Sequence, residues 1–352
     1  MEVQKIKPEP ARYHAVNPEK LRSARFLERP NRFLVRCSLE GQDIEAFLPN
    51  PGRLWEILLP GTELLISKDG VREGRKTAYT VIAAKKKNNF ILLHTHLTND
   101  AAEFLLKVGK GPGLEGWRVA KREAVFGRSR FDFLLEKDGR RLILEVKSCS
   151  LFGERLAMFP DAPSDRGRKH VEELAGLAEE GVSGAVLFLV QSCQPDYFLP
   201  DFHTDPKFAH SLYGNKDKIR LIPVGVRWTD GMGISGAPRL LNIPWGVYEE
   251  NSSCTGVSLV LGERGRGGFW VKAEDGEKHH AGLKVIPIRS GALEIGEIER
   301  NLASAADGEG AEDGRRVFYF NNPPLENPSL AAMVLYLRTD GLLDQGREGT
   351  YH

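Results

Sequence analysis

The chain has 352 residues, of which 41% are hydrophobic and 28% are charged, and its formal net charge is +1. This composition excludes a disordered or fibrous chain and is typical of a folded protein, and the length indicates two or three domains. The charge is uneven, because residues 1–90 carry 17 Lys and Arg against 11 Asp and Glu, whereas residues 251–352 carry 11 against 15. A basic front part favours an anionic partner, although an imbalance of this size also arises by chance.

The four cysteines are far apart in the sequence and contain no CxxC pair. This spacing disfavours a disulfide framework and a zinc site, and it indicates a reducing compartment. No apolar run approaches the length of a membrane span, and the N-terminal MEVQKIKPEP contains no hydrophobic signal segment. We therefore expect a soluble cytoplasmic protein without a membrane partner.

Residues 1–90 are expected to form the first domain, built from short strands separated by turn signals. Glu40-Gly41 separates two of these strands, and Asp69-Gly70 is a hairpin signal between two more. Several short strands within so few residues favour a small barrel of the OB-fold kind.

Residues 91–245 are expected to form a mixed α/β domain. It begins with a short helix over residues 100–108, for which Asn99 or Asp100 is the N-cap candidate. The segments WRVAKREAVFG, RSRFDFLLE and RLILEVKS then follow as three strands.

The same domain continues with a helix over residues 164–181, with Ser164 as the N-cap candidate and Gly181 just after the end. The apolar run over residues 184–191 is typical of a strand that is covered on both faces. Residues 246–352 are loop-rich and show no catalytic constellation, so we treat them as a small C-terminal extension of unknown role.

The hairpin of the second and third strands carries the carboxylates of Asp132 and Glu145. If Asp138-Gly139 forms the two-residue loop, paired residues have numbers that sum to 277. Asp132 then lies directly opposite Glu145, and Lys147 shares the face of Glu145. Opposed like charges destabilise a sheet, so folding alone gives no reason for this pair.

A divalent cation between these carboxylates would turn their repulsion into coordination, and oxygen ligands are what Mg²⁺ prefers. Lys147 could orient or deprotonate a water molecule there, or stabilise charge on a phosphate. Such a set suits hydrolysis of a phosphodiester. The alternative is a partly exposed face on which Arg130 and Lys147 pair with the two carboxylates.

Glu123, on the preceding strand, is either a third metal ligand or a surface residue beside Lys121 and Arg122. Gln191 ends the buried apolar strand, at a level where site residues of open α/β sheets often lie. Its alternative role is that of an ordinary polar residue at a strand end.

The helix after Ser164 carries Arg166, Lys169 and His170 at spacings of three and four, so these residues share one face. A basic face near a helix N-terminus suits a contact with phosphate. The alternative is a solvated face that Glu172 and Glu173 balance.

Several motifs occur in an order that resembles the sugar fermentation stimulation protein A (SfsA) family, over roughly residues 20–230. They are ERPNRFLVR (28–36), FLPNPGRLWEILLPG (47–61), KTAYTV (76–81), FGRSRFDFLLE (126–136), LEVKSCSL (144–151), MFPDAPSDRGRKHVEEL (158–174) and LFLVQ (187–191). The extension after about residue 245 has no counterpart in this resemblance.

The resemblance implies an N-terminal OB-fold-like barrel, followed by a restriction-endonuclease-like domain of the D…ExK, or PD-(D/E)XK, pattern. Asp132, Glu145 and Lys147 match the D…ExK positions, and Glu123 is the accessory acid. The family is usually described as DNA-binding and as a regulator of sugar metabolism. Arg32 and Arg53 fall in its barrel motifs, where arginines suit contacts with a nucleic-acid backbone.

The leading hypothesis is therefore a DNA-binding protein with a metal-dependent nuclease site. Asp132, Glu145 and Glu123 would hold Mg²⁺ or Mn²⁺, and Lys147 would assist the attacking water. The expected contacts to single- or double-stranded DNA are Arg32, Arg53, Arg130, Arg166, Lys169, His170 and Gln191.

The alternative function is a non-catalytic DNA-binding regulator of sugar-metabolism genes. RNA is a third option for the substrate, because no feature of the sequence distinguishes DNA from RNA by the 2′-hydroxyl group. The sequence is compatible with a homodimer.

Overall fold

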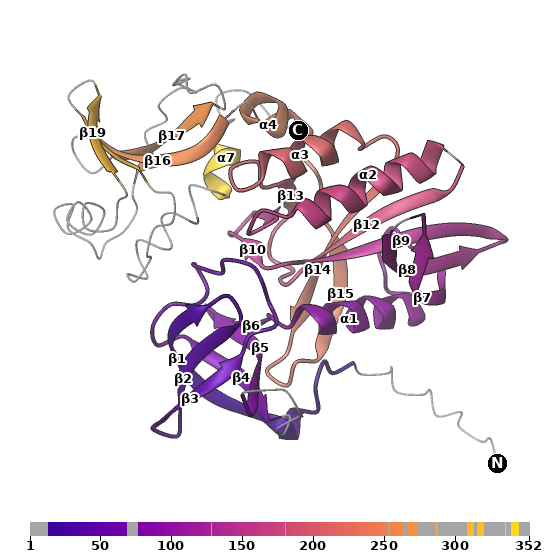
Figure 1. Ribbon diagram of the computed structural model, residues 1–352, viewed down its shortest axis with the longest axis horizontal. Helices are drawn as coiled ribbons and strands as arrows, with labels where there is room; N and C mark the ends of the chain where they lie inside the picture. Colours follow the sequence, from indigo (N-terminus) through magenta and orange to yellow (C-terminus); the bar gives the residue numbers. More distant parts are fainter. Residues whose placement is uncertain are drawn as a thin grey trace, which may run out of the picture.

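The computed structural model describes residues 13–68, 77–127, 129–179 and 181–252 in full, with further short segments between residues 254 and 344. Within this described part of the chain, no helix combines the length and the apolar character that a membrane crossing requires. Figure 1 shows the barrel (indigo and violet) below a larger α/β domain.

The first domain is a barrel, because its strands close on themselves. β3 pairs with β2 on one side and in parallel with β5 on the other, which completes the ring β1-β2-β3-β5-β4 of an OB fold. A 3-10 turn precedes it and β6 extends it; the bounds are η1 Pro18–Lys20, β1 Leu21–Asn31, β2 Leu34–Leu39, β3 Gln42–Phe47, β4 Glu63–Lys68, β5 Tyr79–Lys86 and β6 Asn89–Leu92.

The expected hairpin at Glu40-Gly41 is confirmed, since both residues have positive φ (52° and 82°) between β2 and β3. Such a pair of φ angles is what a two-residue turn between twisted strands requires. The other expected hairpin signal, Asp69-Gly70, lies outside the described residues.

The second domain is built on a mixed six-stranded sheet of order β15-β14-β12-β9-β8-β7, in which β9, β12 and β14 are parallel. A small sheet, β10-β11-β13, lies beside it. The strands are β7 Arg118–Phe126, β8 Ser129–Lys137, β9 Arg140–Cys149, β10 Leu151–Phe152, β11 Leu156–Phe159, β12 Ser183–Val190, β13 Tyr197–Pro200, β14 Arg220–Trp228 and β15 Ile234–Leu240. The helices are α1 Thr95–Lys107, α2 Asp165–Glu179, α3 Pro206–Gly214 and α4 Trp245–Asn251.

Helices α1 and α2 cover opposite faces of this sheet (Figure 1). Leu105 of α1 shares a buried cluster with Leu144 of β9, whereas Leu174 of α2 shares another with Ile143. The alternation of neighbouring β9 side chains between the two clusters explains why this strand is apolar throughout. The α2 cluster also contains the barrel core, so both domains pack as one body.

The ends of α2 agree with the sequence, but the start of α1 does not. Ser164 Oγ accepts a hydrogen bond from the Gly167 N–H at 3.1 Å, and Gly181 follows the helix with φ +84°. Helix α1 begins at Thr95, so the prediction that Asn99 or Asp100 is its N-cap is wrong. The cause is tertiary, because the N–H and Oγ1 of Thr95 donate to the carbonyl of Pro49 in the barrel.

The C-terminal extension contains a separate sheet of order β18-β17-β16-β20-β19 and the short helix α7. The bounds are β16 Cys254–Gly262, β17 Arg266–Ala273, β18 Ile286–Pro287, β19 Gly308–Glu312, β20 Arg315–Tyr319 and α7 Asp340–Asp344. Buried Asp340 joins it to the second domain, since its carboxylate accepts from the N–H groups of Glu154, Arg155 and Leu156 at 2.6–2.9 Å.

We expect Asp340→Ala to destabilise the chain, because three N–H groups, two before β11 and one at its start, would lose a charged acceptor. Hydrogen bonds to a charged group contribute about 1.5–3 kcal/mol each, so a fall in Tm of roughly 5–10 °C is expected in scanning calorimetry. Asp217→Ala, at an exposed carboxylate whose described ion pair is with the adjacent Lys216, is the control. Equal Tm values for the two variants would contradict this anchoring role.

Candidate metal and nucleic-acid site

A cleft of about 1,090 Å³ lies between the barrel and the second domain. Asp132, Glu145 and Lys147 all line it, so the carboxylates that the sequence sets opposite each other reach one cleft. Other lining residues come from both domains and include Arg32, Arg53, Trp55, Glu123, Arg130 and Arg166.

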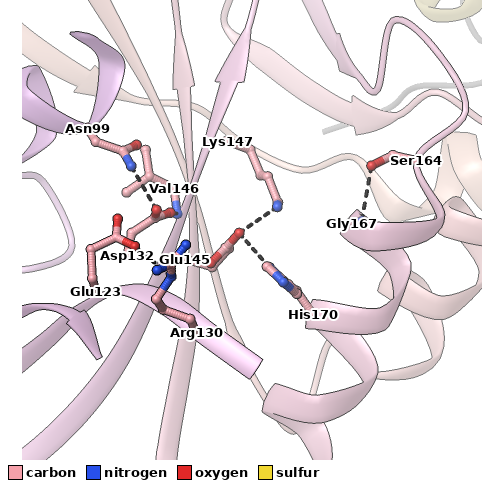
Figure 2. A network of polar contacts seen from close by, with 10 residues as sticks. All are labelled: Asn99, Glu123, Arg130, Asp132, Glu145, Val146, Lys147, Ser164, Gly167 and His170. Atoms are coloured by element: carbon pink, nitrogen blue, oxygen red, sulfur yellow. Dashed lines mark hydrogen bonds and ion pairs between the residues drawn. The ribbon is translucent and has the colours of Figure 1, made fainter. Parts of the chain in front are cut away.

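The cleft begins where the β8–β9 ladder ends. Backbone pairs run from Lys137 with Arg140 to Phe133 with Leu144, which is the register that the sequence predicted. At the next step Asp132 Oδ2 accepts from the Val146 N–H at 2.7 Å, so a side chain replaces the backbone partner. Figure 2 shows the other oxygen of Asp132 meeting the Asn99 amide, whose Nδ2 donates at 2.7 Å from α1.

The end of this ladder also changes the side of the sheet that Phe131 faces. Regular alternation along the predicted hairpin would place Phe131 and Phe133 on one face, against one core. In the structure Phe133 belongs to the α1 cluster, whereas Phe131 packs 5.4 Å from the ring of His170 on α2. That expectation was wrong: the pairing of β8 with β9 ends at Phe133, and beyond it β8 is paired only with β7 among the described strands.

Glu145 is almost fully buried, and one of its oxygens meets both Lys147 and His170 (Figure 2). Lys147 Nζ donates to Oε1 at 2.7 Å, and His170 Nδ1 lies 2.6 Å from the same atom. The second oxygen, Oε2, is buried and has no hydrogen-bond partner among the residues that the structure describes.

The two carboxylates differ in their electrostatic surroundings. Burial, reinforced by the charge of Glu145, raises the pKa of Asp132 to about 6. Burial also raises the pKa of Glu145, but the charge of Lys147 and the hydrogen bond with His170 outweigh it, so this pKa is lowered. Glu145 is therefore compensated by charged neighbours, whereas the direct partners of Asp132 are neutral N–H donors.

Glu123 reaches the cleft from β7 at the ladder step of Asp132, between the pairs Arg122–Phe133 and Ala124–Phe131. Its side chain is exposed, and its Oε2 pairs with Arg130 Nε at 2.8 Å. No group of three His, Cys, Asp or Glu side chains in the described ranges is arranged to hold a metal ion. The role of Glu123 as a third ligand stays a prediction.

The expected basic face of α2 is divided in the structure. Arg166 is exposed and lines the cleft, whereas exposed Lys169 pairs with Glu173 at 3.6 Å and lies outside the cleft lining. His170 is only 4% exposed and contacts Glu145, so its prediction as a DNA contact is wrong. The sequence does hold the signal, because His170 belongs to a buried stripe at helical spacing, made of Gly167, His170, Val171 and Leu174.

Gln191 is also misassigned as a DNA contact. It is 1% exposed, its Nε2 donates to Ser148 Oγ, and its Oε1 accepts from Trp228 Nε1. It lines a second cavity of about 450 Å³ and not the cleft. Its amide therefore fixes the ends of β9, β12 and β14 in the interior.

Two further residues, not singled out from the sequence, hold the barrel loop of residues 49–54 over the cleft. Arg29 donates to four carbonyl groups around this loop, those of Arg32, Asn50, Gly52 and Arg53, at 2.6–3.0 Å. From the other domain, Asp161 Oδ2 accepts from the Leu54 N–H at 2.7 Å. Charge spacing does not reveal either residue, because their partners are backbone groups distant in sequence.

Comparisons with known proteins agree with this architecture. Residues 27–93 match the SfsA N-terminal OB domain, and residues 96–231 match the sugar fermentation stimulation protein RE domain. The fold expected from the sequence, an OB-fold barrel followed by a restriction-endonuclease-like mixed α/β domain, is confirmed.

Among curated proteins, a sugar fermentation stimulation protein homolog of Methanosphaera stadtmanae is 41% identical over 232 residues, which cover 64% of this chain and 96% of that protein. A homolog of Methanothermobacter thermautotrophicus is 41% identical over 187 residues, covering 53% and 78%. The solved structure of Pyrococcus furiosus SfsA in complex with Ca²⁺ is 29% identical, with a TM-score of 0.60, and the match covers 66% of this chain and 99% of that one.

Removing the charge of Asp132 should stabilise the metal-free chain at neutral pH. Folding raises this pKa from 3.8 to about 6, so the folded state binds the proton more tightly between these values and stability falls as the pH rises through them. We expect Asp132→Asn to raise the free energy of unfolding by ~2 kcal/mol at pH 7.5, after a discount for partial exposure, and hardly at all at pH 4.

Urea unfolding in EDTA at both pH values measures this difference. Asp138→Asn, in the exposed turn between β8 and β9, is the control and should change stability equally little at each pH. A gain for Asp132→Asn that is the same at pH 4 and pH 7.5 would refute the assigned pKa shift.

Proposed function

The chain belongs to the sugar fermentation stimulation protein family, and from that premise we propose that it binds DNA and hydrolyses phosphodiester bonds with Mg²⁺ or Mn²⁺. The observation that supports this most is the carboxylate pair on the cleft. The pKa of Asp132 is raised, so its ionisation costs free energy in the folded chain. Oε2 of Glu145 is buried and receives no hydrogen bond from the residues that the structure describes. Both features disfavour the metal-free state and favour a bound cation.

The residues present fit a hard divalent ion. Buried carboxylate oxygens are suitable ligands, and Asp132 with Glu145 Oε2 would hold the ion. Glu123 would join them if it released Arg130. When bound, the ion supplies positive charge that neutralises a phosphate. The relative from Pyrococcus furiosus was solved in complex with Ca²⁺, an ion that also takes oxygen ligands, and this supports a cation site here.

Lys147 supplies a fixed positive charge beside these ligands. Its Nζ is held at 2.7 Å from Glu145 Oε1, and the residue lines the cleft, so it can contact a phosphate oxygen or a water molecule there. A preorganised cation of this kind stabilises charge that develops on the phosphate. His170, on the far side of the same oxygen, keeps Glu145 in one orientation.

Arginines from both domains support DNA binding by the same cleft. Arg32 and Arg53 line it from the barrel, and Arg166 lines it from α2. Contacts of this type with phosphates position a nucleic acid without reading its sequence. A non-catalytic regulator would need these arginines too, but it would have no use for a buried carboxylate pair in which ionised Asp132 opposes folding.

We expect the purified chain to cut DNA with Mg²⁺ or Mn²⁺ and not with EDTA. Asp132→Ala and Lys147→Ala should each lower the rate at least about 100-fold, because each removes a charge fixed beside the reacting phosphate. Rates are measured on labelled single-stranded DNA, double-stranded DNA and RNA, with Glu136→Ala, an exposed carboxylate of the same strand, as the control.

If the wild type cuts none of these substrates, or if the Asp132 and Lys147 variants cut as fast as the control, hydrolysis is excluded. The non-catalytic regulator would then be the function. Cutting of RNA alone would keep the site chemistry and replace DNA as the substrate.

A further inference from the structure

We propose that the cleft binds single-stranded DNA, and that Trp55 with Arg53 forms a platform on which a base stacks beside the carboxylate site. A role of this platform in catalysis rests on the proposed function, whereas its binding of a single strand does not. Three features of the described residues carry it: a fixed barrel loop over the cleft, recessed carboxylates, and an aromatic and cationic pair in the lining.

The barrel loop of residues 49–54 is bonded to the second domain at both of its ends. Pro49 accepts from Thr95 at the start of α1, through its N–H at 3.2 Å and its Oγ1 at 2.9 Å. At the other end Leu54 donates to Asp161 at 2.7 Å in a buried position. Since the barrel core is also continuous with the α2 cluster, the cleft cannot open without breaking these contacts.

The reacting groups lie deep in this fixed cleft. Glu145 is 4% exposed, and half-buried Asp132 is bonded to Val146 and Asn99. A duplex is stiff over about 150 base pairs, and both of its strands must enter a site together. A single strand bends at each nucleotide and presents its phosphates and bases separately. The recessed floor between two fixed walls therefore favours the single strand.

The lining contains a surface suited to an unpaired base. The guanidinium of Arg53 lies 4.8 Å from the ring centroid of Trp55, and both residues line the cleft. Stacking on an aromatic ring, aided by an arginine, is the usual sequence-tolerant way to bind single strands. In a duplex the base faces are covered by their neighbours, so this pair would have nothing to stack on.

Cationic groups continue this surface on both sides of the carboxylates. Arg32 lies on the barrel side of the cleft and Arg166 on the α2 side, and both are exposed. A strand with one base on Trp55 would pass between them, with its phosphates near the arginines. This arrangement of an aromatic platform within a cationic groove is that of single-strand binding sites in general.

The test measures binding by fluorescence anisotropy in EDTA, with a labelled 12-nucleotide DNA strand and with the same strand in a duplex. We expect the single strand to bind at least tenfold more tightly. Trp55→Ala should weaken single-strand binding about tenfold, in keeping with the loss of one stacked base, and Trp55→Phe should restore most of it. Duplex binding should change little in either variant.

Trp117→Phe and Trp117→Ala are the matched controls, because Trp117 has Arg140 at 5.9 Å from its ring but lies outside the cleft lining. Neither should change single-strand affinity, and Tm values show that all variants are folded. Equal affinity for strand and duplex, or an unchanged affinity of folded Trp55→Ala, overturns the proposal. Because EDTA prevents cleavage, this result stands apart from the nuclease test, so either idea can fail alone.

Discussion

The hydrogen bond from the Val146 N–H to the carboxylate of Asp132 is the contact on which the site depends. It replaces a backbone carbonyl at the end of the β8–β9 ladder, so the two strands separate at this point. Beyond this point Glu145 and Lys147, although little exposed, line the cleft between the domains.

The charges of the two carboxylates are compensated to different degrees, and this difference supports the proposed cation site. Glu145 has Lys147 and His170 on one oxygen, which keeps it ionised although it is buried. Asp132 receives only neutral N–H donors from Val146 and Asn99, so its ionisation opposes folding. Proteins keep such local conflicts at functional sites, where a ligand removes the cost.

Local patterns in the sequence predicted most of the fold. The Asp138-Gly139 turn fixed the register as far as Phe133, and helix-end signals placed α2. The wrong predictions concern residues whose position depends on a segment that is distant in the sequence. Pro49 of the barrel moves the start of α1, and His170 turns inward because Glu145 lies beneath α2. Spacing along one helix shows which residues share a face, but only the packed structure shows which face is buried.

A chain of buried contacts links the extension, the second domain and the barrel. Asp340 accepts from three N–H groups just before and at the start of β11. The segment after β11 carries Asp161, which accepts from Leu54 of the barrel loop, and Arg29 fixes the other carbonyls of that loop. The C-terminal segment is therefore bonded to the same domain that holds the barrel loop through Asp161. Since every connection in this series is a charged group bonded to backbone, these contacts hold the barrel loop in place against the second domain, and the proposed selectivity depends on that fixed position.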